Sequence, residues 1–163
     1  MTARTADRDD IDAIRRVAEA AWETDYPEIL TRETVTEGVE QWYDADRIAG
    51  ELDESATLLL VAESEGSVVG FAHATYNESE AAGYILRLYV DPDHRAGGVG
   101  RELFERTREE LTDYDIERIH AMVLAENDPG NAFYREFGFE LTEENETRIG
   151  ESRYRENRYT IDV

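Results

Sequence analysis

The chain has 163 residues, 40% of them apolar, which suits one globular domain spanning residues 1–163. It has no apolar run near the ~20 residues that a membrane-spanning helix needs, and its first residues do not resemble a signal peptide, so we expect a cytoplasmic protein. Cysteine is absent, which excludes disulfides, thiolate metal sites and an acyl-cysteine intermediate.

The charge is strongly negative. Asp and Glu number 39 against 17 basic residues, all of them Arg, and the formal net charge is -22. Such a surface repels nucleic acid and anionic lipid, so neither is an expected partner. The acidic residues are spread along the whole chain, and this favours adaptation to high salt in a halophilic organism. Attraction of a cationic substrate is the alternative explanation.

The N-terminal part of the chain predicts a strand and two helices. The strand ends near Thr5, and Asp7 or Asp9 then caps a helix whose apolar residues recur at helical spacing. A second helix is expected over residues 31–43. The polar segment 44–55 predicts no definite structure.

The rest of the chain alternates between strands and helices. Residues 57–62 and 67–76 form a hairpin about a turn at residues 63–66. One helix is expected from a glycine-rich loop to about Tyr114, and a short one over residues 131–137. Further strands are expected over residues 83–90, 118–124, 139–141 and 154–161. This order predicts an α+β fold with a mixed, mostly antiparallel central sheet, one parallel crossover and flanking helices.

The glycine-rich loop carries the first chemical signal. The run Arg95-Ala96-Gly97-Gly98-Val99-Gly100 has three glycines in four positions, which lets backbone N–H groups approach a ligand. The helix that follows adds its positive N-terminal end, and Arg95 adds a fixed cation. The combination is typical of a phosphate site, although a connection without a ligand can have the same composition.

Two common phosphate-binding motifs do not match this loop. A P-loop needs a Lys, and the chain has none. A dinucleotide fingerprint needs a third glycine where Leu103 stands. Coenzyme A, with its pyrophosphate, remains as the candidate ligand.

At this point the sequence resembles the GNAT superfamily of N-acetyltransferases. The family's central motif, Arg/Gln-x-x-Gly-x-Gly/Ala at the start of a helix, matches residues 95–100. Its second motif reads Asn127-x-x-Gly130-x-x-x-Tyr134-x-x-x-Gly138-Phe139, with Gly130 where the family usually has Ala. The opening segment, residues 4–11, matches more weakly.

The resemblance implies a GNAT-like fold and direct transfer of the acetyl group from acetyl-CoA to a primary amine through a ternary complex. Tyr134 would be the catalytic acid that protonates the departing thiolate, since a phenol with an ordinary pKa near 10 stays protonated at neutral pH. The residues implied to bind the pantetheine arm, the pyrophosphate or the thioester are Leu88, Tyr89, Val90, Arg95, Ala96, Gly97, Gly98, Val99, Gly100, Arg101, Asn127 and Asn131.

The base that deprotonates the amine is not identified by the resemblance. The Glu that several families place before the glycine-rich loop is absent, because residues 86–88 read Leu-Arg-Leu. The Glu of enzymes that acetylate ribosomal-protein N-termini is Met122 here. The remaining candidates are Asp25, Glu28, His73 and a chain of water molecules.

The acceptor stays open between a small amine, a polyamine and a protein amine. By the resemblance, residues 22–30 would form its wall. Two rival functions are a degenerate domain that binds acyl-CoA as a sensor or partner module, and an acyltransferase for a longer acyl-CoA. The three histidines lack ligand spacing, so we predict no metal. Many relatives form dimers through their C-terminal strands, and the sequence neither supports nor excludes a homodimer.

Overall fold

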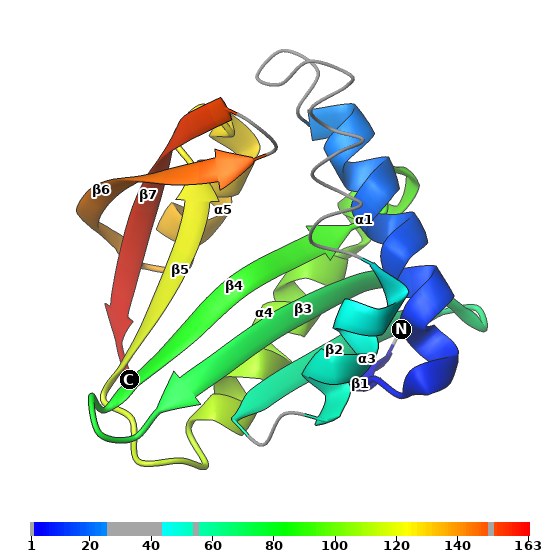
Figure 1. Ribbon diagram of the computed structural model, residues 1–163, viewed down its shortest axis with the longest axis horizontal. Helices are drawn as coiled ribbons and strands as arrows, with labels where there is room; N and C mark the ends of the chain where they lie inside the picture. Colours follow the sequence, from blue (N-terminus) through cyan, green and yellow to red (C-terminus); the bar gives the residue numbers. More distant parts are fainter. Residues whose placement is uncertain (1, 26–43, 54–55, 150–151) are drawn as a thin grey trace.

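The structure, a computed structural model, describes residues 2–25, 44–53, 56–149 and 152–163 (Figure 1). In this part of the chain, one seven-stranded sheet has the order β1-β2-β3-β4-β5-β7-β6. Its strands are β1 (Thr2–Thr5), β2 (Thr57–Ser64), β3 (Ser67–Asn77), β4 (Ala82–Val90), β5 (Arg118–Leu124), β6 (Glu140–Ile149) and β7 (Ser152–Asp162). The helices are α1 (Ile11–Asp25), α3 (Ala45–Asp53), α4 (Val99–Leu111) and α5 (Asp128–Glu136), with short 3-10 helices η1 (Arg8–Asp10) and η2 (Pro92–Gly97).

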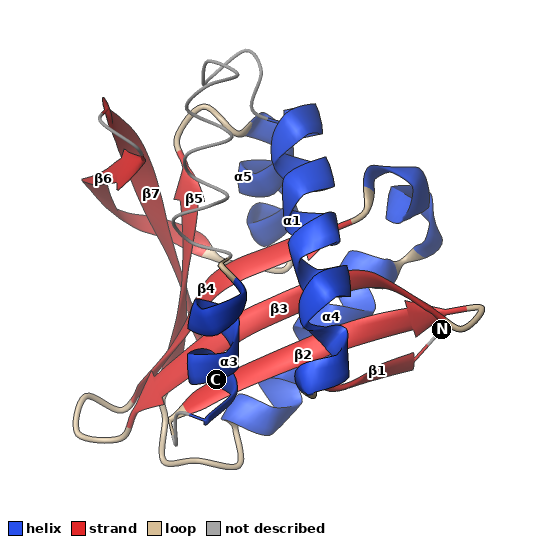
Figure 2. Ribbon diagram, turned by 45° about the vertical axis from the view of Figure 1, so that its right-hand side comes forward, coloured by secondary structure: helices blue, strands red, loops and turns tan. Residues whose placement is uncertain are grey.

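The sheet is covered on both faces. Helices α1 and α3 lie on one face and α4 lies on the other, as Figure 2 shows. On the α1 face, Val17 and Trp22 pack in one buried cluster with Phe71 of β3. On the α4 face, Phe104 and Tyr134 share a second cluster, so α5 lies on the same side as α4. None of the described helices is long and apolar enough to span a bilayer.

Strand pairing confirms the predicted sheet. Neighbouring strands are antiparallel throughout, except for β4 and β5, which run parallel. These two strands are paired only at one end, from Ala82 opposite Arg118 to Ile85 opposite Ala121. Beyond that point they separate in a V (Figure 1). The V leaves one edge of β4 and one edge of β5 without a strand partner among the described residues.

A β-bulge on β4 lies where the separation begins. In the register between β3 and β4, Arg87 is opposite His73 and Ile85 is opposite Ala74, so Leu86 is an extra residue. A bulge bends its strand and increases its twist. The bulge therefore accounts for β4 turning away from β5 directly after Ile85.

The bulge also changes which face the β4 side chains occupy. Ile85 is fully buried in the cluster on the α4 face, whereas Tyr89 packs against the cluster on the α1 face. Side chains alternate along a regular strand, so Ile85, Arg87 and Tyr89 would otherwise share one face. The extra residue places Arg87 and Tyr89 on the α1 face instead.

Three predicted elements differ from the structure. Residues 45–53, for which no structure was predicted, form α3, with Asp44 accepting a hydrogen bond from the Asp46 N–H at 3.2 Å and Ile48 buried. The helix predicted over residues 131–137 begins earlier, at Asp128, because Asn127 caps it and Pro129 occupies its first turn. The helix predicted to run to Tyr114 ends at Leu111.

The last predicted strands were too short. The strand expected over residues 139–141 is β6, which extends to Ile149 because it pairs with β7 along its length. Its side chains are almost all exposed, so the apolar alternation that marks a strand is missing. The helix predicted over residues 31–43 lies outside the described residues.

Candidate active site

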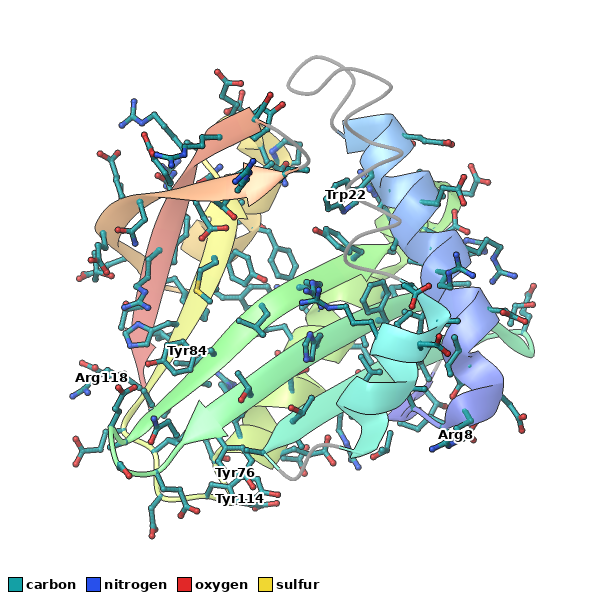
Figure 3. All side chains as sticks on the ribbon, in the orientation of Figure 1. Arg8, Trp22, Tyr76, Tyr84, Tyr114 and Arg118 are labelled. Atoms are coloured by element: carbon teal, nitrogen blue, oxygen red, sulfur yellow. The ribbon has the colours of Figure 1, made fainter. Side chains whose placement is uncertain are left out.

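A cleft of about 350 Å³ opens where β4 and β5 separate. Side chains from β4 and β5 line it together with residues of α1, α4, α5, β6 and β7. Trp22 enters its wall from the C-terminal part of α1 (Figure 3). The lining residues are Trp22, Leu86, Arg87, Leu88, Tyr89, Val90, Arg95, Gly98, Gly100, Arg101, Met122, Val123, Leu124, Asn127, Pro129, Gly130, Phe133, Tyr134, Glu136, Phe137, Ile149 and Glu156.

The N-terminus of α4 lies at one end of this cleft. Gly98 is the N-cap residue, with φ 78° and ψ 15° in the left-handed region that favours glycine. The first backbone hydrogen bond of the helix runs from the Glu102 N–H to the Gly98 carbonyl at 3.1 Å. The N–H groups of Val99, Gly100 and Arg101 therefore precede the helical ladder, and Gly98 has no side chain to cap them. Together with the helix dipole they form a site suited to a phosphate group.

Two arginines lie beside this helix end. The Arg95 Nε donates a hydrogen bond to the Val90 carbonyl at 3.3 Å, which ties the loop to the end of β4. The Arg101 guanidinium lies 5.0 Å from the centre of the Phe137 ring, and both residues line the cleft. Each side chain adds positive charge near the helix N-terminus, which complements an anionic group.

The glycines at positions 98 and 100 of the loop are needed for different structural reasons. A Cβ on Gly100 would lie 3.0 Å from the Phe133 ring, so glycine here permits close contact between α4 and α5. A Cβ on Gly97 or Gly98 would meet nothing within 4 Å, and only Gly98 has a positive φ. The left-handed turn at Gly98 thus exposes the helix N-terminus, while Gly100 serves packing.

Asn127 caps α5 at the opposite wall of the cleft. Its Oδ1 accepts a hydrogen bond from the Gly130 N–H at 3.2 Å. A Cβ on Gly130 would lie 2.7 Å from the Asn127 Nδ2 and 2.9 Å from a methyl group of Val123. The glycine at this position therefore accommodates the observed position of the Asn127 amide.

Tyr134 lies on α5 with its side chain at the cleft wall. It is buried, and its ring makes edge contacts with Phe133 and Phe139 at centroid distances of 5.2 and 5.3 Å. Burial raises the pKa of the Tyr134 phenol well above its ordinary value, and the nearby Tyr89 adds to this effect. The hydroxyl therefore stays protonated at neutral pH.

Asn131 does not line the cleft. It is 4% exposed, and its Nδ2 donates to the carbonyls of Leu124 and Asn127 at 3.0 and 2.6 Å. Its Oδ1 accepts hydrogen bonds from Asn157 at 2.8 Å and from the Tyr159 hydroxyl at 2.5 Å. These internal bonds occupy both ends of the amide. They join α5 to β5 and β7, and the predicted contact of Asn131 with the cofactor stays a prediction.

His73, one of the residues predicted as the base, is poorly placed to deprotonate an amine in the cleft. His73 is buried on β3, does not line the cleft, and its Nδ1 lies 2.9 Å from the Arg87 Nη1. Burial, with the positive charge of Arg87 and Arg47, lowers the pKa of His73 to about 3. Such a weak base is poorly suited to take a proton from an ammonium ion. Glu28 and the side chain of Asp25 lie outside the described residues.

The structure places two carboxylates at the cleft that no sequence motif indicated, Glu136 of α5, which is exposed, and Glu156 of β7. Glu156 of β7 lines the cleft and is half-buried. Burial raises the pKa of its carboxyl, and the neighbouring charge of Arg158 partly offsets this. The sequence identified β7 as a strand. It gave no indication that β7 lies beside β5 at the cleft, because this depends on long-range pairing.

Most of the predicted cofactor-binding residues meet at this cleft. Among the residues that line it are Leu88, Tyr89, Val90, Arg95, Gly98, Gly100, Arg101, Asn127 and Tyr134. Gly97 and Val99 do not line it; Val99 is buried against Leu103. The side chain of Ala96 is not described. In the described segments, no cluster of three or more His, Cys, Asp or Glu residues has the arrangement of a metal site.

Comparison with known sequences gives a consistent picture. The profile of the Acetyltransferase (GNAT) family matches residues 13–139. An acetyltransferase of Sodalis glossinidius is 29% identical over 118 residues, which cover 72% of this chain and 82% of that protein. A mycothiol acetyltransferase of Saccharomonospora viridis is 31% identical over 111 residues, which cover 64% of this chain and 33% of that longer protein.

Solved structures share the same fold. The PaiA N-acetyltransferase of Thermoplasma acidophilum, solved in complex with coenzyme A, has a TM-score of 0.82 at 21% identity, covering 96% of this chain and 98% of that one. A GCN5-related N-acetyltransferase of Rhodopseudomonas palustris has a TM-score of 0.84 at 20% identity, covering 99% and 95% of the two chains. The V-shaped cleft, the open helix N-terminus and the family match together show that this chain belongs to the GNAT family of acetyltransferases.

Proposed function

We propose that the protein transfers an acetyl group from acetyl-CoA directly to a primary amine while both substrates are bound. The observation that carries this proposal is the convergence of the α4 N-terminus, the separated edge of β4 and the buried Tyr134 on one cleft. Acetyl-CoA would supply the activated acetyl thioester. The chain's own groups bind and orient it and exchange protons with the reacting atoms.

The binding groups follow the length of the cleft. The N–H groups of Val99, Gly100 and Arg101 would bind the pyrophosphate, with Arg95 adding positive charge. The pairing of β4 with β5 ends at Ile85, so the backbone of Leu88–Val90 would pair with the extended pantetheine arm as an added strand would. The Asn127 amide, which borders the same cleft, would bind the thioester end of the cofactor.

Tyr134 would act as the acid. As the C–S bond breaks, the sulfur gains negative charge, and the Tyr134 hydroxyl would give it a proton. The raised pKa of the phenol keeps this proton in place until that charge develops. Its burial between Phe133 and Phe139 fixes the ring in position.

The test is Tyr134→Phe, measured with acetyl-CoA and a panel of small amines, polyamines and peptide amines by release of free thiol. We expect the variant to reduce turnover by roughly 10²–10⁴-fold while CoA binding is retained. Tyr114→Phe is the matched control, because Tyr114 stacks on Tyr76 at the opposite end of the sheet (Figure 3). An unchanged rate in Tyr134→Phe would remove this residue as the acid.

The same assay separates the rival functions. Binding of CoA without turnover of any amine above the rate with water would favour an acyl-CoA sensor or partner module and exclude the enzyme proposal. Faster turnover with a longer acyl-CoA than with acetyl-CoA would favour the other rival, an acyltransferase of different donor preference.

A further inference from the structure

Glu156 stands on the cleft wall opposite the face that carries Tyr134. It lies on β7, where it is the register neighbour of Leu124 on β5. The adjacent Asn157 points to α5, since its amide bonds to Asn131. Side chains alternate along β7, so Glu156 points to the α1 face of the sheet.

The other residues of β7 support this orientation. Tyr159 shares the direction of Asn157 and is buried beside Tyr134, at a ring distance of 6.3 Å. Tyr154 shares the direction of Glu156 and packs against the cluster that contains Trp22. The lining of the cleft therefore includes the Tyr134 phenol from the α4 face of the sheet and the Glu156 carboxylate from its α1 face.

The surroundings of Glu156 set it apart from its neighbours. Arg155 pairs with Glu144 at 3.2 Å and Arg158 pairs with Glu143 at 3.3 Å, both with side chains of β6. In the described parts of the chain, no ion pair or hydrogen bond engages the Glu156 carboxylate. A half-buried carboxylate that faces a cleft without such a partner is a candidate for contact with a ligand.

We propose that Glu156 is the base of the reaction: it binds the acceptor as an ammonium ion on the α1-face side of the cleft and takes the proton that the amine must lose. This inference rests on the proposed acetyl transfer and identifies the base, which the sequence analysis left open. It also assigns the acceptor side, since a cation is drawn to a carboxylate, and Trp22 and Met122 line the same cleft.

The atoms balance in this arrangement. One proton passes from the ammonium nitrogen to the Glu156 carboxylate, which frees the nitrogen lone pair. The N–C bond to the acetyl carbonyl carbon forms and the C–S bond breaks, and the thiolate takes the proton of Tyr134. The second proton of the nitrogen leaves to solvent, Glu156 releases its proton to solvent, and Tyr134 recovers one proton from solvent.

Burial suits Glu156 to this task, because the raised pKa makes the carboxylate a stronger base than an exposed Glu. Arg158 on β7 is the charged neighbour that acts on its pKa. The other charged or titratable residues that line the cleft are Arg87, Tyr89, Arg95, Arg101, Tyr134 and Glu136. Its register neighbours, Leu124 on β5 and Asn145 on β6, do not titrate.

The experiment compares Glu156→Gln, Glu156→Asp and the control Glu140→Gln, an exposed residue of β6. We expect Glu156→Gln to lower kcat/KM at neutral pH by roughly 10²–10⁴-fold and to remove the acidic limb of its pH profile, with the Kd for CoA unchanged. Glu156→Asp should retain the acidic limb, and Glu140→Gln should behave as the wild type.

Acceptor basicity supplies an independent readout. A peptide α-amino group, with a pKa of about 8, is partly neutral at pH 7, whereas a lysine-like amine with a pKa of about 10.4 is almost fully protonated. The loss in Glu156→Gln should therefore be smaller for the less basic acceptor. Equal losses, an unchanged rate, or a parallel loss of CoA binding would each overturn the proposal. Absence of turnover in the wild type would instead refute the proposed function itself.

Discussion

Asn131 offers a direct test of whether a motif residue binds the cofactor or holds the fold. We consider Asn131→Leu, which keeps a similar side-chain volume and removes the amide. In the structure this amide receives two buried hydrogen bonds, from Asn157 and from the Tyr159 hydroxyl. It also donates to the carbonyls of Leu124 and Asn127. The substitution leaves the two donors and the two carbonyls without this partner.

The expected loss of stability follows from the two buried donors, the Asn157 amide and the Tyr159 hydroxyl, that lose their acceptor. Each buried polar group without a partner costs about 1–3 kcal/mol, and partial rearrangement lowers the sum, so we expect a loss of about 3 kcal/mol in the free energy of unfolding. For a domain of this size about 1 kcal/mol corresponds to 2–4 °C, which places the fall in Tm at about 6–12 °C. Chemical denaturation with urea measures the same quantity independently.

The control and a second variant make the test specific. Asn145→Leu changes an exposed residue of β6 and should alter the unfolding free energy by less than about 0.5 kcal/mol. Tyr159→Phe added to Asn131→Leu removes one orphaned hydroxyl and should recover about 1 kcal/mol. A fall in Tm below about 3 °C, combined with weaker CoA binding, would refute the structural role and return Asn131 to the cofactor site.

Two further predictions concern the loop and the N-terminal ion pair. Gly98→Ala places a side chain at a φ of 78°, so it should lower the free energy of unfolding by about 1–2 kcal/mol and raise the KM for acetyl-CoA. Gly97→Ala, the control, should change neither quantity. Urea denaturation and steady-state kinetics measure the two quantities, and equal effects of the two variants would contradict the role of the turn. The Arg4 guanidinium, by hydrogen bonding to Asp10 at 2.8 and 2.9 Å, lowers the pKa of that carboxyl below its ordinary 3.8, so the pair stabilises the fold above that pH and the stabilisation is lost as pH falls through the folded-state pKa. The difference in unfolding free energy between the wild type and Asp10→Asn should therefore shrink as pH falls from about 6 to about 3, and a constant difference would contradict this assignment.

Local patterns in the sequence were sufficient for much of the fold. The hairpin of β2 and β3, the strand β5 and the helix after the glycine-rich loop follow from apolar periodicity and turn residues, which act over a few positions. The position of Tyr134 at the cleft was predicted only through the family motif. Its burial then follows from the aromatic residues on either side of it.

Features set by pairing between distant segments could not be predicted. Nothing in residues 82–90 marks Leu86 as a bulge, because the bulge is defined by its partner on β3. Strand β6 has exposed side chains and exists through its pairing with β7. Glu156 reaches the cleft because β7 lies beside β5, so its place could not be read from the residues around it.

The short junction between β4 and β5 has a mechanical consequence. The sheet consists of two parts, β1–β4 and β5–β7, whose strands are joined by the residue pairs from Ala82–Arg118 to Ile85–Ala121. The buried cluster around Phe104 packs against this junction on the α4 face of the sheet. A ligand that fills the cleft touches both parts beyond Ile85, where the described strands β4 and β5 are no longer paired. The bound ligand therefore connects the two parts of the sheet and limits their motion relative to each other, so binding of the substrate also makes the protein more rigid.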